Sequence, residues 1–182
     1  MLEAFNKYKE DYYIMTQRKW KFLGGGVRTI KHRNLRFCFF GRMASSNSKI
    51  ISSMGHLIQK HYENRYGLEI SFSNISGGLL LLHPYNITVN SRARLGKNVT
   101  LFKGSTIGSV RSGRREGVPV IGDRVVLCVN ATVVGNVKIG NDVLVAANTL
   151  VDFDVPDNSV VIGNPGQIIH KKNASKDYLT GL

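Results

Sequence analysis

The chain has few cysteines and no long apolar segment. Its 182 residues include only Cys38 and Cys128. Two cysteines are too few for a disulfide framework, so we expect both to be buried thiols. No stretch approaches the roughly 18 consecutive apolar residues of a membrane-spanning helix. The first residues also lack the apolar core of a signal peptide. The sequence therefore predicts a cytoplasmic protein.

Acidic residues are missing from most of the first third. None lies between Asp11 and Glu63, where ten Lys and Arg residues are interleaved with aromatic ones. Residues 1–66 hold 13 basic and 4 acidic residues, a net +9 of the chain's +13. This pattern favours contact with an anionic membrane surface or lipid-linked substrate, or a solvated helical face above an aromatic core. Both interpretations stay open. No nucleic-acid-binding motif accompanies the charges, so we expect no nucleic acid partner.

The second half of the chain has a six-residue repeat. A large aliphatic residue recurs at Val89, Leu95, Leu101, Ile107, Ile121, Leu127, Val133, Ile139, Val145 and Val151. In most of these repeats the residue four places on is small or β-branched. A short internal period indicates a solenoid, and six matches neither the strand nor the helix period. We expect the chain to turn a corner every six residues and to form a triangular prism with aliphatic side chains on its axis.

Two interruptions of the repeat mark unusual corners. Leu81 and Val89 are eight residues apart instead of six, with the two additional residues near His83 and Pro84. We expect that corner to project outward. The polar, basic and Gly-rich residues 109–119 separate two repeats and predict a loop that leaves the prism. Loops on rigid scaffolds commonly carry function.

The composition divides the chain into three segments. Residues 1–66 predict a basic, aromatic-rich helical cap, with helices over 1–16 and 45–66 and a break at the glycines 24–26. Residues 67–172 contain the repeats, and residues 173–182 predict a flexible tail.

These motifs resemble the hexapeptide-repeat acyltransferases of the serine acetyltransferase branch. Residues 77–89 are similar to the coil that carries the catalytic histidine of that branch, and residues 160–169 to the closing turn of the superfamily. The short basic cap is similar to that of capsule and exopolysaccharide O-acetyltransferases. The resemblance implies a mainly β fold, a left-handed parallel β-helix with a small N-terminal helical cap, assembled as a homotrimer.

The same resemblance makes His83 the candidate general base. Acetyl transfer from a thioester to a hydroxyl requires removal of the hydroxyl proton, and histidine titrates near neutral pH. Glu69 is either the carboxylate that orients His83 or an ordinary exposed side chain. His83 is the one histidine inside the repeats, since His170 lies at their end, whereas a zinc site needs three or four ligands. We therefore expect no metal.

The resemblance also implies where the ligands bind. It places the acyl donor acetyl-CoA in a groove between subunits, along Gly108, Val129 and Ala147. Lys171 and Lys172 are candidates to contact the CoA phosphates. Three arginines of the predicted loop are candidates to bind the acceptor: Arg111, Arg114 and Arg115.

Two departures from serine acetyltransferases influence the expected acceptor. Leu82 stands where that branch has Asp, and residues 117–119 replace its Arg-His-Pro run. We therefore expect acetyl transfer to a hydroxyl of a polysaccharide or its sugar or lipid-linked precursor, in the cytoplasm or at the inner membrane face. One alternative is a serine O-acetyltransferase of cysteine biosynthesis. Another is a non-catalytic β-helix scaffold or membrane-binding module.

Overall fold

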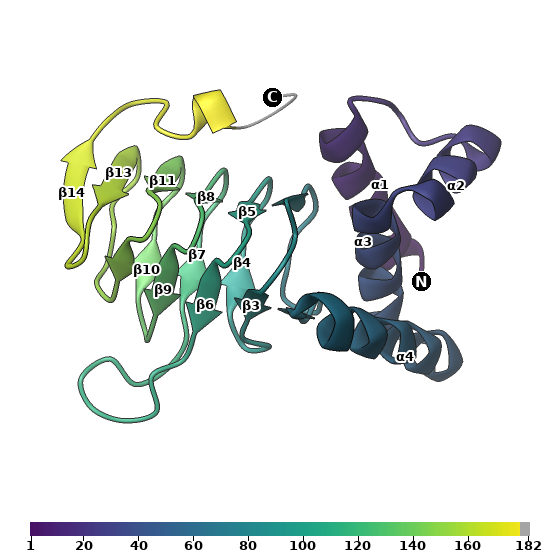
Figure 1. Ribbon diagram of the computed structural model, residues 1–182, viewed down its shortest axis with the longest axis horizontal. Coiled ribbons are helices and arrows are strands. Elements are labelled where there is room, and N and C mark those ends of the chain that lie inside the picture. Colours follow the sequence, from purple (N-terminus) through teal and green to yellow (C-terminus); the bar gives the residue numbers. More distant parts are fainter. Residues whose placement is uncertain (179–182) are drawn as a thin grey trace.

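Four helices precede a long series of short strands in the computed structural model, which describes residues 1–178 (Figure 1). The helices are α1 (Leu2–Thr16), α2 (Phe22–Lys31), α3 (Arg33–Ala44) and α4 (Lys49–Tyr66). The strands are β1 (Leu68–Ile70), β2 (Leu80–Leu82), β3 (Ile87–Val89), β4 (Arg94–Leu95), β5 (Thr100–Phe102), β6 (Thr106–Gly108), β7 (Val120–Ile121), β8 (Val126–Leu127), β9 (Thr132–Val134), β10 (Lys138–Ile139), β11 (Val143–Val145), β12 (Leu150–Val151), β13 (Ser159–Ile162) and β14 (Gln167–His170). A 3-10 turn, Lys176–Tyr178, ends the described chain.

The strands form three sheets that wind into a triangular prism. Sheet A has the order β1-β3-β6-β9-β12, sheet B the order β4-β7-β10, and sheet C the order β2-β5-β8-β11-β13-β14. All pairs are parallel except β13 with β14, which closes the prism. The chain visits A, B and C in turn, so the five strands of sheet A correspond to five coils. This left-handed parallel β-helix with an N-terminal helical region confirms the predicted fold class.

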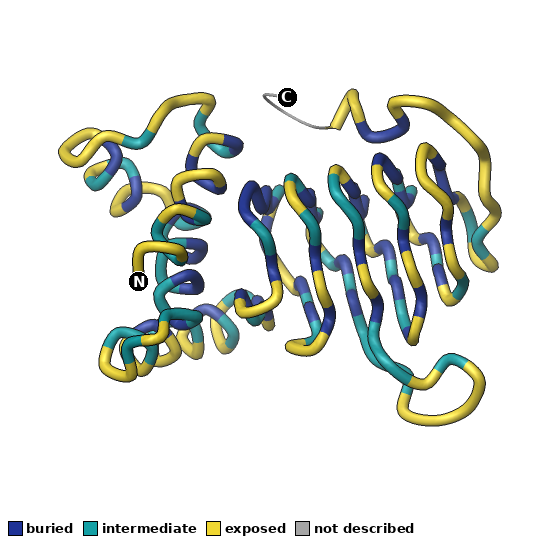
Figure 2. Tube along the Cα trace, turned by 180° about the vertical axis from the view of Figure 1, so that it is seen from behind, coloured by how far each residue is buried: buried dark blue, intermediate teal, exposed yellow. Residues whose placement is uncertain are grey.

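The predicted axis positions form the core of the prism. Leu101, Leu127 and Val145 are fully buried, and no other repeat aliphatic is more than 4% exposed. The residues four places on are buried as well, as for Ala131 and Val143. Removing apolar surface from water contributes roughly 25 cal/mol per Å², so the repeat sequence favours this winding at every coil. Figure 2 shows buried and exposed residues alternating around the coils and the exposed loop that leaves them.

Residues with left-handed backbone conformation stack along two edges of the prism. Where sheet C meets sheet A, the stack is Gly67, Asn86, Gly104, Asn130 and Asn148; where sheet B meets sheet C, it is Gly78, Asn98, Arg124, Asp142 and Asn158. Gly and Asn adopt this conformation at low cost. Within residues 67–172, His83 is the one non-glycine residue with positive φ outside these two stacks.

The helical cap covers the N-terminal end of the prism and shares its hydrophobic core. A buried ion pair between α1 and α3 lies at this junction: Arg42 donates from Nε and Nη2 to the Asp11 carboxylate, at 2.9 Å each. Arg42 also donates to the carbonyls of Ile75 and Ser76, at 2.6 Å each, and Asp11 accepts from the Leu79 amide at 2.8 Å. Burial raises the pKa of Asp11, and the Arg42 charge opposes this shift. Arg42 is 1% exposed and is therefore not one of the surface cations that the sequence suggested.

The path of α2 differs from the sequence prediction. The helix continues through Gly24, Gly25 and Gly26, where we expected a break. A side chain at Gly25 would lie 2.6 Å from Nε1 of Trp20, so the close approach of the indole requires glycine there. Each glycine costs a helix about 1 kcal/mol relative to alanine, and packing against Trp20 offsets part of this cost.

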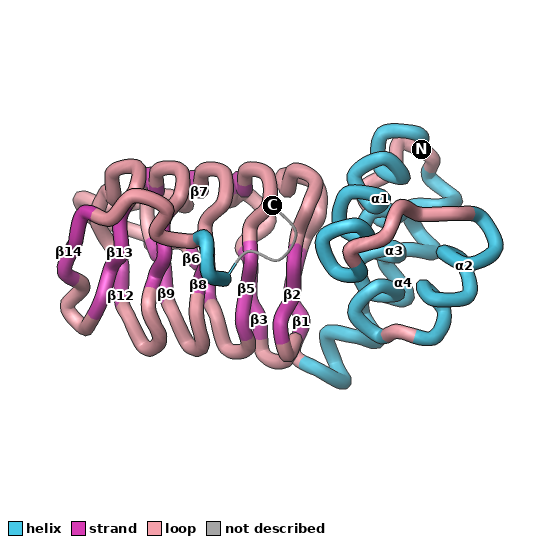
Figure 3. The backbone as a smooth tube through the Cα atoms, turned by 90° about the horizontal axis from the view of Figure 1, so that it is seen from above, coloured by secondary structure: helices cyan, strands magenta, loops and turns pink. Residues whose placement is uncertain are grey.

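The segment after β14 packs against sheet C and runs back along the prism (Figure 3). Ser175 donates from its amide and its hydroxyl to Oδ1 of Asp142, at 3.1 and 2.6 Å, and the Ala174 amide donates to Oδ2 at 3.2 Å. The Tyr178 ring lies 6.2 Å from that of Phe102. Residues 173–178 thus differ from the flexible tail expected for 173–182, and residues 179–182 lie outside the described part. None of the helices within 1–178 has the length and apolar character needed to cross a membrane.

Candidate active site

The candidate site lies along the edge where sheet C meets sheet A. In the first coil, Leu82 pairs with Phe102 and Asn86 stacks on Gly104. Three residues, beginning with His83, therefore span this corner, whereas one residue spans it in the next coil. The two-residue insertion predicted near His83 is present.

His83 occupies an unusual backbone position. Its φ is +51°, in the left-handed region that costs most non-glycine residues about 1–2 kcal/mol. Such strained residues cluster at functional sites. The side chain is exposed and has no hydrogen bond or ion pair within residues 1–178. An imidazole held in this way is free to accept a proton from a bound hydroxyl.

Glu69 is not joined to His83 within one chain. It is the middle residue of β1, exposed on the outer face of sheet A and paired in register with Thr88. No hydrogen bond or ion pair of the Glu69 side chain occurs in the described part of the chain. The pairing of Glu69 with His83 stays a prediction.

Two of the predicted donor-binding positions share the edge of His83. Val129 and Ala147 stack on successive coils there, with the Asn148 amide bonded to the Val129 carbonyl at 3.0 Å. Within residues 1–178, the backbone N–H groups of Val129 and Ala147 donate no hydrogen bond. Exposed Lys103 occupies the equivalent place in the coil between them and His83. The edge thus carries two free amide donors on successive coils, which can pair with carbonyl groups of an extended ligand.

The remaining donor-binding candidates lie on other edges of the same chain. Gly108 pairs with Val134, at the far end of sheet A from Val129. Lys171 and Lys172 are exposed and follow β14, where the Lys171 amide bonds to the Asn158 carbonyl at 2.8 Å. One chain by itself does not bring these residues to the edge of His83.

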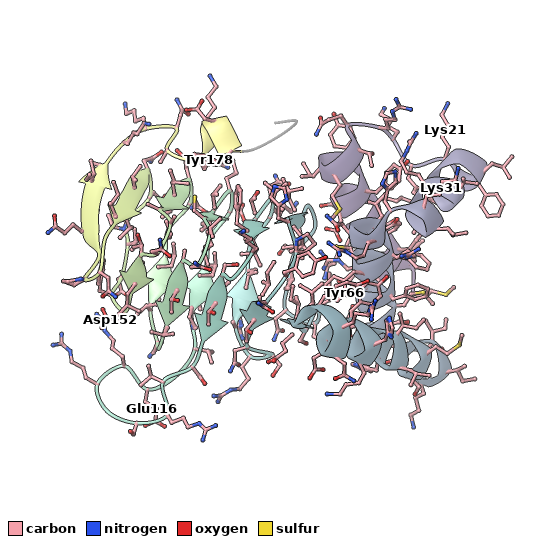
Figure 4. All side chains as sticks on the ribbon, in the orientation of Figure 1. Lys21, Lys31, Tyr66, Glu116, Asp152 and Tyr178 are labelled. Carbon is pink, nitrogen blue, oxygen red and sulfur yellow. The ribbon has the colours of Figure 1, made fainter. Side chains whose placement is uncertain are left out.

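The predicted loop is present and leaves the prism where sheet A meets sheet B. Val110 and Gly117 pair at its base, and Figure 4 shows Glu116 at its outer part. Arg111 and Arg114 are exposed, while Arg115 lies 3.7 Å from the Asp154 carboxylate. All three arginines are therefore separated from His83 of the same chain by the width of sheet A.

A cavity that the sequence did not reveal lies between the cap and the first coil. Its volume is about 470 Å³, and its lining includes Leu82, the residue before His83. Three arginines and a histidine line it: Arg18, Arg28, Arg33 and His32. The basic composition of residues 1–66 was the only available signal, because the convergence of these side chains depends on how α1, α2 and α3 pack.

The described residues show neither a cluster of metal-ligating side chains nor an exposed thiol. The described residues contain no group of three or more His, Cys, Asp or Glu side chains placed to hold a metal ion. Cys38 and Cys128 are both free and buried, as the sequence suggested, and burial raises the pKa of each thiol.

The chain is similar to serine acetyltransferases. It is 36% identical over 104 residues to that of Staphylococcus aureus (strain Mu50), which covers 57% of this chain and 49% of the relative. A crystal structure of the Neisseria gonorrhoeae serine acetyltransferase in complex with serine matches 92% of this chain and 69% of that one, at TM-score 0.74 and 22% identity. A serine acetyltransferase in complex with CoA matches 92% and 70%, at TM-score 0.75 and 17% identity.

These matches cover only part of the relatives. This chain spans about a third to about half of the length of the curated relatives it matches. It matches no protein-family model. The likeness to solved structures, at these identities, demonstrates the fold.

Proposed function

We propose that the protein is an acetyl-CoA-dependent O-acetyltransferase in which His83 is the general base. The position of His83 carries this proposal: it is exposed, strained and unpaired, and it stands at the head of an edge with free backbone donors. The similarity to serine acetyltransferases supports the same activity.

In the proposed reaction, Nε2 or Nδ1 of His83 accepts the proton of the acceptor hydroxyl as its oxygen attacks the thioester carbonyl. A free backbone N–H of the edge stabilises the oxyanion. As the carbon–sulfur bond breaks, the His83 imidazolium returns its proton to the sulfur, and CoA leaves as the thiol. Both cysteines are buried, so neither is placed to form a covalent acyl intermediate. We therefore propose direct transfer within a complex of both substrates.

Serine is the first candidate acceptor. The named relatives are serine acetyltransferases, and one solved structure that shares the fold is in complex with serine. These comparisons do not support the polysaccharide acceptor expected from the sequence. A sugar hydroxyl remains the second candidate because Leu82 and Val118 stand where serine acetyltransferases have Asp and His.

The decisive experiment measures thiol release from acetyl-CoA with a panel of acceptors: L-serine, neutral and acidic monosaccharides, and oligosaccharides. Acceptor-dependent release by the wild-type protein, lost in His83→Ala, supports the proposal. Release by neither protein with any acceptor of the panel contradicts it and favours the scaffold alternative.

We further propose that the active unit is a homotrimer. In one chain, Gly108 and the loop arginines lie on a different edge from His83. Three-fold packing of prisms places that edge of one chain beside the His83 edge of the next. This arrangement brings the predicted donor-binding residues of two chains to one edge.

Finally, we propose that α2 docks the protein on an anionic membrane surface. Phe22, Leu23 and Ile30 are 81%, 79% and 68% exposed. Lys21 and Lys31 flank this apolar face at the ends of the helix (Figure 4). An amphipathic helix of this kind inserts its apolar face at a bilayer interface while its lysines attract anionic lipids.

A further inference from the structure

The cavity between the cap and the first coil has the composition of an anion-binding site. Its lining includes Arg18, Arg28, Arg33 and His32 and contains no Asp or Glu. None of the three guanidinium groups has a carboxylate partner within residues 1–178. Arginine binds carboxylates and phosphates through planar, charge-assisted hydrogen bonds. Three of them around one cavity leave a concentrated positive charge unneutralised.

Aromatic contacts hold two of these arginines in place. The Arg33 guanidinium packs against the rings of Tyr66 and Tyr85, at 4.6 and 4.5 Å from their centroids, and Nη1 donates to the Tyr85 hydroxyl at 2.7 Å. Nη1 of Arg28 donates to the Tyr12 hydroxyl at 3.0 Å. Each guanidinium keeps further N–H groups available, and Nε of Arg33 is buried with no partner. These arginines are therefore oriented before a ligand binds.

The lining of the cavity extends to Leu82, the residue before the candidate general base. Leu80, Leu81 and Leu82 form its floor, and His83 follows at the next position. Asn34 fixes this floor by donating from Nδ2 to the Leu81 carbonyl at 3.2 Å. Arg33 contacts Tyr85, two residues beyond His83. A molecule whose hydroxyl lies at His83 can thus extend its other end toward the arginines.

We propose that this cavity binds the acidic group, a carboxylate or a phosphate, of the acceptor whose hydroxyl reacts at His83. The proposal rests on the proposed acetyl transfer and names the class of its acceptor: a hydroxyl compound that carries an anionic group. It also gives a role to the cap, because Arg18, Arg28 and Arg33 all precede the repeats. These cap arginines supply the positive charge that the loop arginines of the same chain lie too far away to provide.

The first test compares acceptors that differ only in the acidic group. Thiol release is measured with L-serine against L-serinamide, glucuronate against glucose, and glucose 1-phosphate against glucose. We expect KM to be at least about 10-fold lower for one acidic member than for its neutral partner. The pair that shows the difference distinguishes a carboxylate from a phosphate. Equal KM values within every pair that reacts would overturn the proposal.

The second test removes single positive charges. Arg28→Gln and Arg33→Gln should raise KM for the acidic acceptor by about 10-fold or more, with a smaller change in kcat and in CoA affinity. Arg18→Gln tests the same cavity at an exposed side chain with no hydrogen-bond partner, so its folding is the least affected. Lys49→Gln, an exposed change in the same cap but outside the cavity, should leave KM unchanged. A loss of CoA affinity instead would assign the cavity to the donor.

A third measurement separates this proposal from the proposed activity. Calorimetric titration of the full chain with inorganic phosphate and with acetate requires no turnover. We expect saturable binding of at least one anion, weakened about 10-fold in Arg28→Gln and retained in Lys49→Gln. Anion binding without any acetyl transfer would contradict the proposed enzymatic function and support the anion site. If the wild-type protein binds neither phosphate nor acetate, the proposed anion site is wrong, whether or not the protein transfers acetyl groups.

Discussion

The buried pair of Asp11 and Arg42 should dominate the attachment of the cap to the prism. Replacing Arg42 with Met removes two hydrogen bonds to Asp11 and two to the carbonyls of Ile75 and Ser76. The Asp11 carboxylate then stays buried with backbone amide donors only. Removing one member of a buried pair typically costs about 3–5 kcal/mol. Because 1.4 kcal/mol corresponds to a factor of ten, the folding equilibrium should shift by about 100-fold to several thousand-fold.

Urea unfolding followed by two probes measures this effect. Trp20 is the single tryptophan and lies in the cap, so its fluorescence reports on the cap, while far-UV circular dichroism reports on the whole chain. In Arg42→Met and in Asp11→Asn we expect the fluorescence transition to move to lower urea, ahead of the signal from the coils. The double replacement Asp11→Leu with Arg42→Met should cost less than the sum of the single changes, since it leaves no unpaired buried charge. Single changes that cost under about 1 kcal/mol, or strict additivity, would refute the reasoning.

Four further predictions follow from the proposed site, assembly and surfaces. His83→Asn should lower kcat by about 100-fold or more while retaining CoA affinity, as measured by thiol release and calorimetry. Sedimentation at micromolar concentration should give about three times the chain mass of 20.2 kDa. The wild-type protein should float with anionic vesicles at low salt and less so at higher salt, because the screening length is about 10 Å at 0.1 M; reversal of Lys21 and Lys31 to Glu should abolish this. Burial alone raises the pKa of Asp142, but hydrogen bonds from Ser175 and Ala174 outweigh it and hold the pKa below the ordinary value of 3.8. The stabilisation that these hydrogen bonds give should therefore be present above pH 3.8 and lost as the pH falls through the folded-state pKa of Asp142. Amide exchange after β14 should then become faster. Asp142→Ala should show the same fast exchange at neutral pH.

Each of these predictions has an outcome that contradicts it. Activity of His83→Asn within a few-fold of wild type removes the histidine from the mechanism. A fully active monomer excludes sites shared between chains. Equal flotation with neutral and anionic vesicles rules out recognition of lipid charge by α2. Amide exchange after β14 that is slow in Asp142→Ala shows that other contacts hold the segment.

The prism could be predicted from the sequence, but much of the cap could not. In the coils, burial follows from the phase of a local repeat, so Leu127, Val133 and the corner at His83 are visible in the sequence. In the cap, the contacts join residues far apart in the chain: Arg42 pairs with Asp11, 31 positions away. Nothing in the sequence distinguishes Arg42, which is buried, from the other basic residues of the segment.

The convergence of groups into the candidate site has the same limitation. His83 is recognisable from the interrupted repeat, whereas the cavity beside it needs the ends of three helices to be placed together. The loop arginines were correctly expected to leave the prism. The edge on which these arginines lie is set by the corner that the loop interrupts, where sheet A meets sheet B. That edge is separated from His83 of the same chain, and the sequence does not show this.

The segment after β14 changes how the prism can unfold. In a solenoid, each coil contacts only its neighbours, so the last coil can fray independently of the others. Here the chain returns from the closing strand, bonds to Asp142 beside β11 and reaches Phe102 on β5. Opening of the last coil must then disturb contacts three coils away, which couples local openings into a larger cooperative unit. We infer that amide protection in the C-terminal coils rises and falls together instead of decreasing gradually toward the end.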